Sequence, residues 1–77
     1  MPPRLTALLS RVFSVPAASI QPDSGPHDLA KWDSAGHMNL IVELEKEFGV
    51  QFSDDEVVEM ISSGNIAETL ARRGVQV

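Results

Sequence analysis

The stretch that decides the fold is residues 33–49, which read DSAGHMNLIVELEKEFG. An Asp-Ser pair opens it, and both residue types are favoured where a helix leaves free backbone N–H groups. Gly49 closes it, at the position where a left-handed C-terminal cap belongs. Apolar side chains recur between them at helical spacing. The pattern therefore predicts the longest helix over residues 34–48, with an inward face of His37, Leu40, Ile41, Leu44 and Phe48.

Shorter helices are expected on both sides of this one. Apolar residues at i, i+3 and i+4 predict a first helix over about residues 3–14. Ser53 and Glu56 fit a capping box, in which each side chain bonds a backbone N–H of the other's turn, and they open a short third helix. Residues 62–65 break that pattern. Apolar residues after the break mark a last helix, which Gly74 ends.

A long segment, residues 14–33, separates the first two helices and contains several prolines. A loop of this length in a compact domain must be structured or functional. Four apolar residues of this segment are expected to pack against the core: Val15, Ile20, Leu29 and Trp32. The predicted core contains Leu9, Phe13, Leu40, Leu44, Phe48 and Leu70. The predicted fold class is all-α, a four-helix bundle with a short third helix and a long loop between helices 1 and 2.

Length and charge restrict the functions to be considered. A chain of 77 residues predicts a single domain, residues 1–77, with a modest core, which favours a carrying or binding role over catalysis. The net charge of -5 disfavours nucleic acid and anionic lipid as partners and favours proteins with basic patches. The longest aliphatic run, residues 40–42, is far too short for a membrane span, and no signal peptide is recognisable. We expect a cytoplasmic monomer.

Few residues are candidates for catalysis or metal binding. Ser34 and His37 could share a helix face, as a minimal hydrolase would need, but no Gly-x-Ser-x-Gly elbow surrounds the serine and no acid is placed to orient the histidine. His37 is expected to be packed or half-buried, and His27 to be a solvated loop residue. An acidic cluster lacks the EF-hand spacing and suits a helix N-terminus instead; its members are Asp54, Asp55, Glu56 and Glu59. We expect no catalytic residue and no metal site.

Taken together, residues 32–41 and 44–50, followed by the capping box at Ser53, resemble the acyl carrier protein family. That family has an Asp-Ser-Leu motif followed by a helix that ends in a Leu-Glu-x-x-Phe-like sequence. The segment from Met60 to Leu70 also looks like the family's last helix. The resemblance covers essentially the whole chain.

The resemblance implies that Ser34 carries 4'-phosphopantetheine, which a separate phosphopantetheinyl transferase attaches. Acyl groups would then be held as thioesters and presented to acyl-loading and acyl-processing enzymes. The alternative is a small helical interaction adaptor, in which Asp33 and Ser34 only cap a helix. The first turn of a helix suits a phosphodiester anion, because its N–H groups are unpaired and its dipole end is positive.

The chain departs from the family pattern near the motif. Ala35 replaces the family's leucine, and Gly36 and Asn39 stand where many fatty-acid carriers have acidic residues. Lys46 interrupts the acidic face, and residues 30–32 do not match the pattern of peptidyl carriers. These departures favour a specialised pathway, such as one for a polyketide, a modified sugar, or an amino- or hydroxy-acid intermediate, over general fatty-acid synthesis.

One stripe of the long helix begins at Ser34 and runs along its outward side. Two hypotheses remain open for its apolar members: they extend the core, or they form an exposed strip, edged by acidic side chains, that partner enzymes recognise. The residues assigned to partner recognition are Asp33, Ala35, Met38, Val42 and Glu45.

Overall fold

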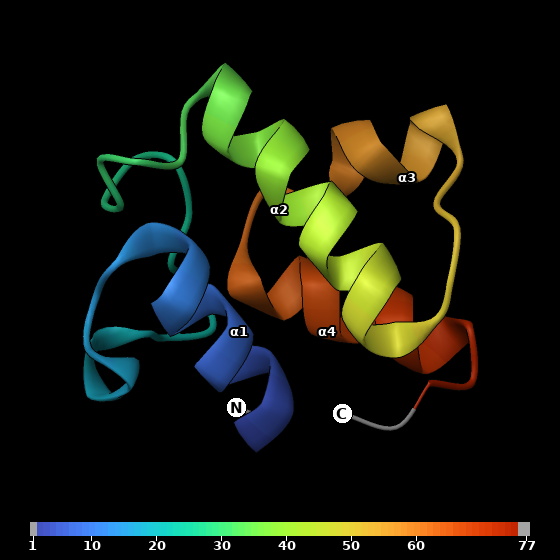
Figure 1. Cartoon of the computed structure of the whole chain (residues 1–77), viewed down its shortest axis with the longest axis horizontal. Coiled ribbons are helices and arrows are strands. Elements are labelled where there is room, and N and C mark those ends of the chain that lie inside the picture. The colour runs from blue at the N-terminus through green and yellow to red at the C-terminus, as the bar shows by residue number, and fades with distance from the viewer. Residues whose placement is uncertain (1, 76–77) are drawn as a thin grey trace.

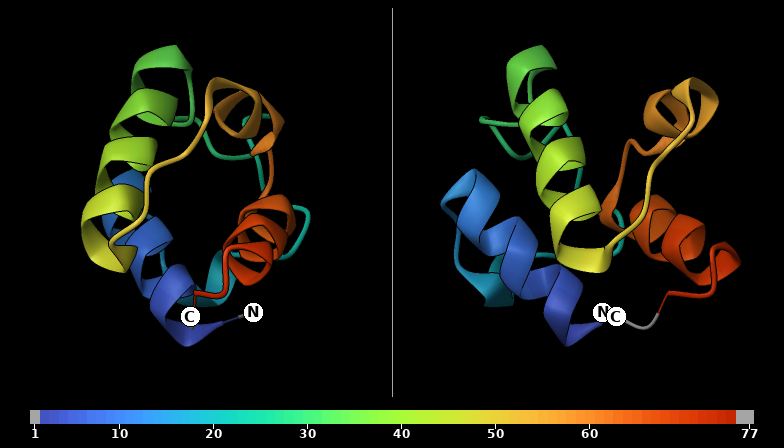
Figure 2. Two further views of the ribbon diagram at one scale, coloured as in Figure 1. Left: turned by 90° about the vertical axis from the view of Figure 1, so that its right-hand side faces the viewer. Right: turned by 45° about the vertical axis from the view of Figure 1, so that its right-hand side comes forward.

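The computed structural model describes residues 2–75. Within that range all regular structure is helical: α1 (Pro3–Phe13), the single 3-10 turn η1 (Ala17–Ser19), α2 (Ser34–Phe48), α3 (Asp54–Glu59) and α4 (Ser63–Arg72). The predicted all-α fold, with a short third helix and a long first loop, is confirmed. In the left view of Figure 2, α2 and α4 lie on opposite sides of the bundle, with α1 near one end and α3 near the other (Figures 1 and 2).

The core is built by α1, α2, α4, the long loop and the residue that follows α3. Its buried apolar side chains are Leu5, Leu8, Leu9, Phe13, Ile20, Leu29, Trp32, Leu40, Ile41, Leu44, Met60, Ile66 and Leu70. All but one of the predicted core residues are therefore buried. Phe48 is the exception: it is only partly buried, because α2 ends there at the edge of the bundle, and the guanidinium of Arg4 lies 4.8 Å from the centre of its ring.

Helix ends follow local sequence rules at two of the predicted positions. Gly49 ends α2 with φ 65°, the left-handed conformation that glycine adopts without a steric penalty. Ser53 caps α3, and the reciprocal bond from its N–H to Glu56 completes the capping box, with N···O distances of 3.2 and 2.9 Å. Both predictions are confirmed.

The start of the last helix was predicted too late. Residues 63–65 do not break the pattern but form the first turn of α4, because Ser62 caps them by accepting the N–H of Asn65 at 3.1 Å. Two further N–H groups of this turn, of Ser63 and Gly64, bond the loop carbonyls of Ser24 and Pro22 at 2.9 and 2.8 Å. Polar residues and glycine are tolerated where every free N–H finds an acceptor.

The long loop is thus part of the scaffold. Ile20, Leu29 and Trp32 are buried as predicted, and Val15 packs against the core from a partly buried position. Trp32 stacks on Phe13 of α1, with ring centres 4.9 Å apart and an angle of 17° between the planes. The loop therefore delivers residues 31–33, the approach to α2, in a fixed position.

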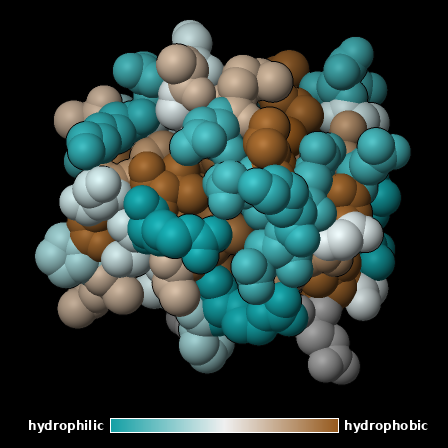
Figure 3. Space-filling model, in the orientation of Figure 1, coloured by the Kyte–Doolittle hydropathy of each residue, from teal (hydrophilic) through white to brown (hydrophobic). Residues whose placement is uncertain are grey.

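The surface is mixed in character. On the face shown in Figure 3, hydrophilic residues dominate the centre and the bottom, while apolar atoms reach the surface left of the centre and in the upper part, where Figure 1 places α3. In residues 2–75 no helix has the length and hydropathy needed to cross a bilayer.

Candidate functional site

Asp33 and Ser34 have different roles at the mouth of α2. Asp33 is the N-cap: its backbone is extended, and its Oδ1 accepts the N–H of Gly36 at 2.8 Å. Ser34 is the first residue of the helix and is exposed. Within residues 2–75 its hydroxyl has no hydrogen-bond partner. The capping function therefore belongs to Asp33 alone, and the Ser34 hydroxyl faces solvent free for chemistry.

The first turn of α2 suits an anion attached at Ser34. Asp33 accepts the N–H of Gly36 through its side chain and that of His37 through its carbonyl. The N–H groups of Ser34 and Ala35 find no acceptor in the described part of the chain. Unpaired N–H groups at the positive end of a helix stabilise a phosphate. The residues present thus fit a phosphodiester on the serine oxygen.

The structure explains why position 36 is a glycine, which the sequence did not reveal. A Cβ at this position would overlap the backbone carbonyl oxygen of Lys31, so the loop passes directly against the first turn of the helix. Glycine allows that approach, which fixes where Asp33 and Ser34 stand. What looked like a missing acidic side chain is a packing requirement.

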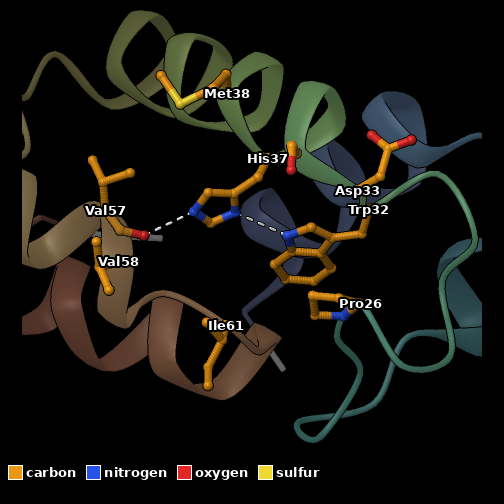
Figure 4. Close-up of a pocket in the computed structure, with 9 residues that line it drawn as sticks. Pro26, Trp32, Asp33, His37, Met38, Val57, Val58 and Ile61 are labelled. Carbon is orange, nitrogen blue, oxygen red and sulfur yellow. Dashed lines mark hydrogen bonds between the residues drawn. The ribbon is translucent and has the colours of Figure 1, made fainter.

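An open hollow lies beside Ser34, between α2, α3 and the long loop (Figure 4). Its volume is about 540 Å³. Met38, Val58 and Ile61 bring apolar side chains to it that are more than half exposed, at 55, 74 and 59 %. The rest of the lining comes from Pro26, Trp32, Asp33, Ser34, His37 and Val57. The attachment position predicted from sequence therefore opens onto an apolar surface.

His37 bridges the inner end of this hollow. Its Nδ1 accepts the indole N–H of Trp32 at 2.9 Å, and its Nε2 lies 2.7 Å from the carbonyl oxygen of Val57 (Figure 4). An indole N–H can only donate and a carbonyl can only accept, so the ring is the neutral tautomer with its hydrogen on Nε2. His37 is half-buried, as predicted.

This bridge removes the serine hydrolase hypothesis. Both ring nitrogens of His37 are bonded to groups other than Ser34, so neither can take the serine's proton. His27 is exposed, with Nε2 3.4 Å from Asp28 Oδ1, as expected of a solvated loop residue. Among the described residues no cluster of His, Cys, Asp or Glu could hold a metal ion.

The stripe assigned to partner recognition is largely exposed. Ala35 is exposed, and Met38 and Val42 are 55 and 48 % exposed, so the hypothesis that they extend the core is wrong. Glu45 is half-buried, and its Oε2 accepts the N–H of Phe52 at 2.9 Å, which ties the connection between α2 and α3 to the helix. It therefore has a structural contact in addition to any role with partners.

The acidic edge of the stripe is partly neutralised. Glu43 lies 3.5 Å from Arg11, and Glu47 lies 3.2 Å from Arg4. On the other side of the hollow, Asp54, Asp55 and Glu59 of α3 are exposed, and within residues 2–75 they have no ion-pair partner. The negative surface nearest the apolar strip is therefore supplied by α3 as well as α2.

Arg73 makes an ion pair that sequence analysis missed. Its guanidinium bonds both carboxylate oxygens of Glu56, at 2.6 and 3.0 Å, and the carbonyl of Gln51. The hydrogen bonds from Arg73 and from the N–H of Ser53 lower the pKa of Glu56 from its ordinary 4.5 to about 2. Arg73 thereby ties the end of α4 to α3.

Comparison with known proteins gives two matches. A family model described as "Phosphopantetheine attachment site" matches residues 3–70. An acyl carrier protein of Acidothermus cellulolyticus is 28 % identical over 71 residues, which cover 92 % of this chain and 84 % of that relative.

Proposed function

Because this chain belongs to the acyl carrier protein family, whose phosphopantetheine attachment model spans most of its length, we propose that Ser34 is the residue that carries the 4'-phosphopantetheine. Proteins of this family are carriers and not enzymes, in keeping with a domain in which no residue was predicted to be catalytic. The proposal extends to the whole chain: residues 1–77 act as one carrier domain.

One observation carries the assignment of Ser34. Its hydroxyl is exposed and unbonded within the described residues, while its neighbour Asp33 does the capping. A serine retained only as a cap would bond the backbone two or three residues ahead, as Ser53 and Ser62 do. Ser34 is therefore available to a modifying enzyme without loss of the helix.

The residues around Ser34 have distinct tasks in the loaded protein. When bound, the phosphopantetheine supplies a thiol that holds an acyl group as a thioester. The protein, which has no cysteine, has no thiol of its own. The free N–H groups of Ser34 and Ala35 stabilise the negative charge on the serine oxygen's phosphodiester. Asp33 holds the first turn in place, and Gly36 lets the loop pack against it.

Partners are proposed from the surface beside the site. A phosphopantetheinyl transferase and acyl-loading and acyl-processing enzymes would dock on Met38 and Val42, with basic patches facing Asp33 and the acidic residues of α3. Apolar contacts at the centre govern residence time, and rim charges govern the association rate. The departures at Ala35 and Asn39 favour a specialised pathway in the cytoplasm, in which this carrier acts as a monomer.

The experiment is an intact-mass measurement after incubation with coenzyme A and a broad-specificity transferase. We expect the wild-type protein to gain the mass of one phosphopantetheine and Ser34→Ala to gain nothing. Ser19→Ala, a change of another exposed serine, is the matched control and should gain the full mass. A folded wild-type protein that gains nothing would instead favour the interaction adaptor.

A further inference from the structure

Two consecutive hydrogen bonds link three segments of the protein through Trp32, His37 and Val57. Trp32 comes from the long loop, His37 from α2 and Val57 from α3 (Figure 4). The rings of Trp32 and His37 are nearly parallel, with 15° between their planes. We call these three residues the bridge.

The bridge lies between the hollow and the core. All three of its members line the hollow, while the indole of Trp32 is only 2 % exposed and stacks on the core ring of Phe13. An acyl chain that enters the core from the Ser34 side must therefore separate α2 from α3 at the bridge.

Separating the bridge by an alkyl chain is unfavourable. The Nε2–H of His37 and the Val57 carbonyl would lose each other as partners when α2 and α3 separate, and an alkyl chain offers neither a replacement. Polar groups that lose their partners inside a protein are costly. A group that rests on Met38, Val58 and Ile61 breaks none of these bonds, because those side chains are already exposed.

We propose, on the basis of the function proposed above, that His37 sets the class of acyl group that this carrier takes. By closing the interior, it keeps the cargo at the surface of the hollow and selects short or polar acyl groups over long alkyl chains that would have to be buried. His37 acts here as a specificity-determining residue and not as a catalyst.

The test compares acyl groups of different length on the same protein. The apo-protein is loaded from acetyl- and octanoyl-coenzyme A by a broad-specificity transferase, and intact mass confirms each product. Thermal melts and the fluorescence of Trp32, the single tryptophan, are then recorded. An acyl chain buried in the core stabilises the fold, because it makes this favourable contact in the folded state only. For the wild type we expect equal melting temperatures and equal tryptophan emission in the two forms.

In His37→Ala the acetyl and octanoyl forms should differ in melting temperature and in tryptophan emission. Its octanoyl form should melt about 4 °C or more above its acetyl form, with a shift in tryptophan emission. Asn39→Ala, at an exposed position of the same helix outside the hollow and the bridge, should behave as the wild type does. His37→Leu is the second variant, since it fills the space left by the ring without restoring the bonds.

Each other outcome overturns the proposal. A wild-type octanoyl form that melts well above the acetyl form would show that the core is open despite the bridge. Equal melting temperatures in every His37 variant would show that another residue excludes the chain. Failure to load any acyl group on Ser34 is a different result, because it removes the proposed function itself and is read directly from the masses.

Discussion

The carboxylate of Asp33 accepts the N–H of Gly36 at 2.8 Å, and this bond separates the capping of α2 from the chemistry of Ser34. In the sequence the two residues form one Asp-Ser motif. In the fold, one stabilises the helix and the other presents an unbonded hydroxyl at its start.

Replacing Asp33 should therefore cost stability, whereas replacing Ser34 should not. Asp33→Ala removes an N-cap worth about 1 kcal/mol, which in a domain of this size lowers the melting temperature by about 4–8 °C. The free energy of unfolding of Ser34→Ala should lie within about 0.5 kcal/mol of the wild-type value, as it does for most surface substitutions. Asp33→Asn keeps a capping oxygen and is the control. Thermal melts followed by circular dichroism check the order, and a larger loss for Ser34→Ala than for Asp33→Ala would contradict it.

Gly36→Ala should disturb the attachment site through the loop. The added Cβ would overlap the carbonyl oxygen of Lys31, a backbone atom that cannot rotate away. We expect a loss of about 1–3 kcal/mol, in the range of overpacked sites, and slower modification of Ser34. Asn39→Ala, on an exposed position of the same helix, should have little effect. Denaturant unfolding measures the loss; unchanged stability in Gly36→Ala would mean that the loop does not pack as described.

The ion pair between Glu56 and Arg73 predicts a pH dependence of stability. The folded pKa of Glu56 is about 2, below its ordinary 4.5. Its contribution to stability is therefore fully present above pH 4.5 and is lost as the pH falls towards 2. Glu56→Gln, which can still accept the N–H of Ser53, should melt below the wild type at pH 7 and approach it between pH 4.5 and 2.

Glu59→Gln is the matched control for that comparison, since Glu59 is exposed on the same short helix without an ion-pair partner in residues 2–75. Its melting temperature should follow the wild type at every pH. A difference between Glu56→Gln and the wild type that stays constant down to pH 2 would show that the charge of Glu56 contributes nothing.

The exposed apolar strip predicts a defect in partner recognition. Met38→Ala should lower the kcat/KM of phosphopantetheine transfer, with little dependence on salt, because the side chain makes an apolar contact at the centre of the proposed docking surface. Its melting temperature should hardly change, since the side chain is 55 % exposed. Glu68→Ala on α4 is the control. A transfer rate unaltered by Met38→Ala would place the docking surface elsewhere.

Sequence alone predicted the features that depend on local rules. The bounds of α2, the αL residue Gly49 and the capping box at Ser53 each depend on residues within one or two turns. The start of α4 was missed because the acceptors for its first N–H groups are Ser24 and Pro22, about forty residues earlier in the chain. No local pattern encodes such a contact.

The candidate site divides in the same way. Ser34 was singled out by its motif, and His37 was correctly placed at the inward side. Its partners Trp32 and Val57 could not be inferred, because Val57 contributes a backbone carbonyl that any residue would supply. The same holds for Gly36, whose role depends on the carbonyl of Lys31.

The central claim is that Ser34 alone carries the prosthetic group, and fragment-ion mass spectrometry of the singly modified protein tests it most directly. We predict that every fragment that contains residue 34 carries the added phosphopantetheine and that every fragment without it has its unmodified mass. Added mass on a fragment that contains Ser10, Ser53 or another serine, but not Ser34, would contradict the account.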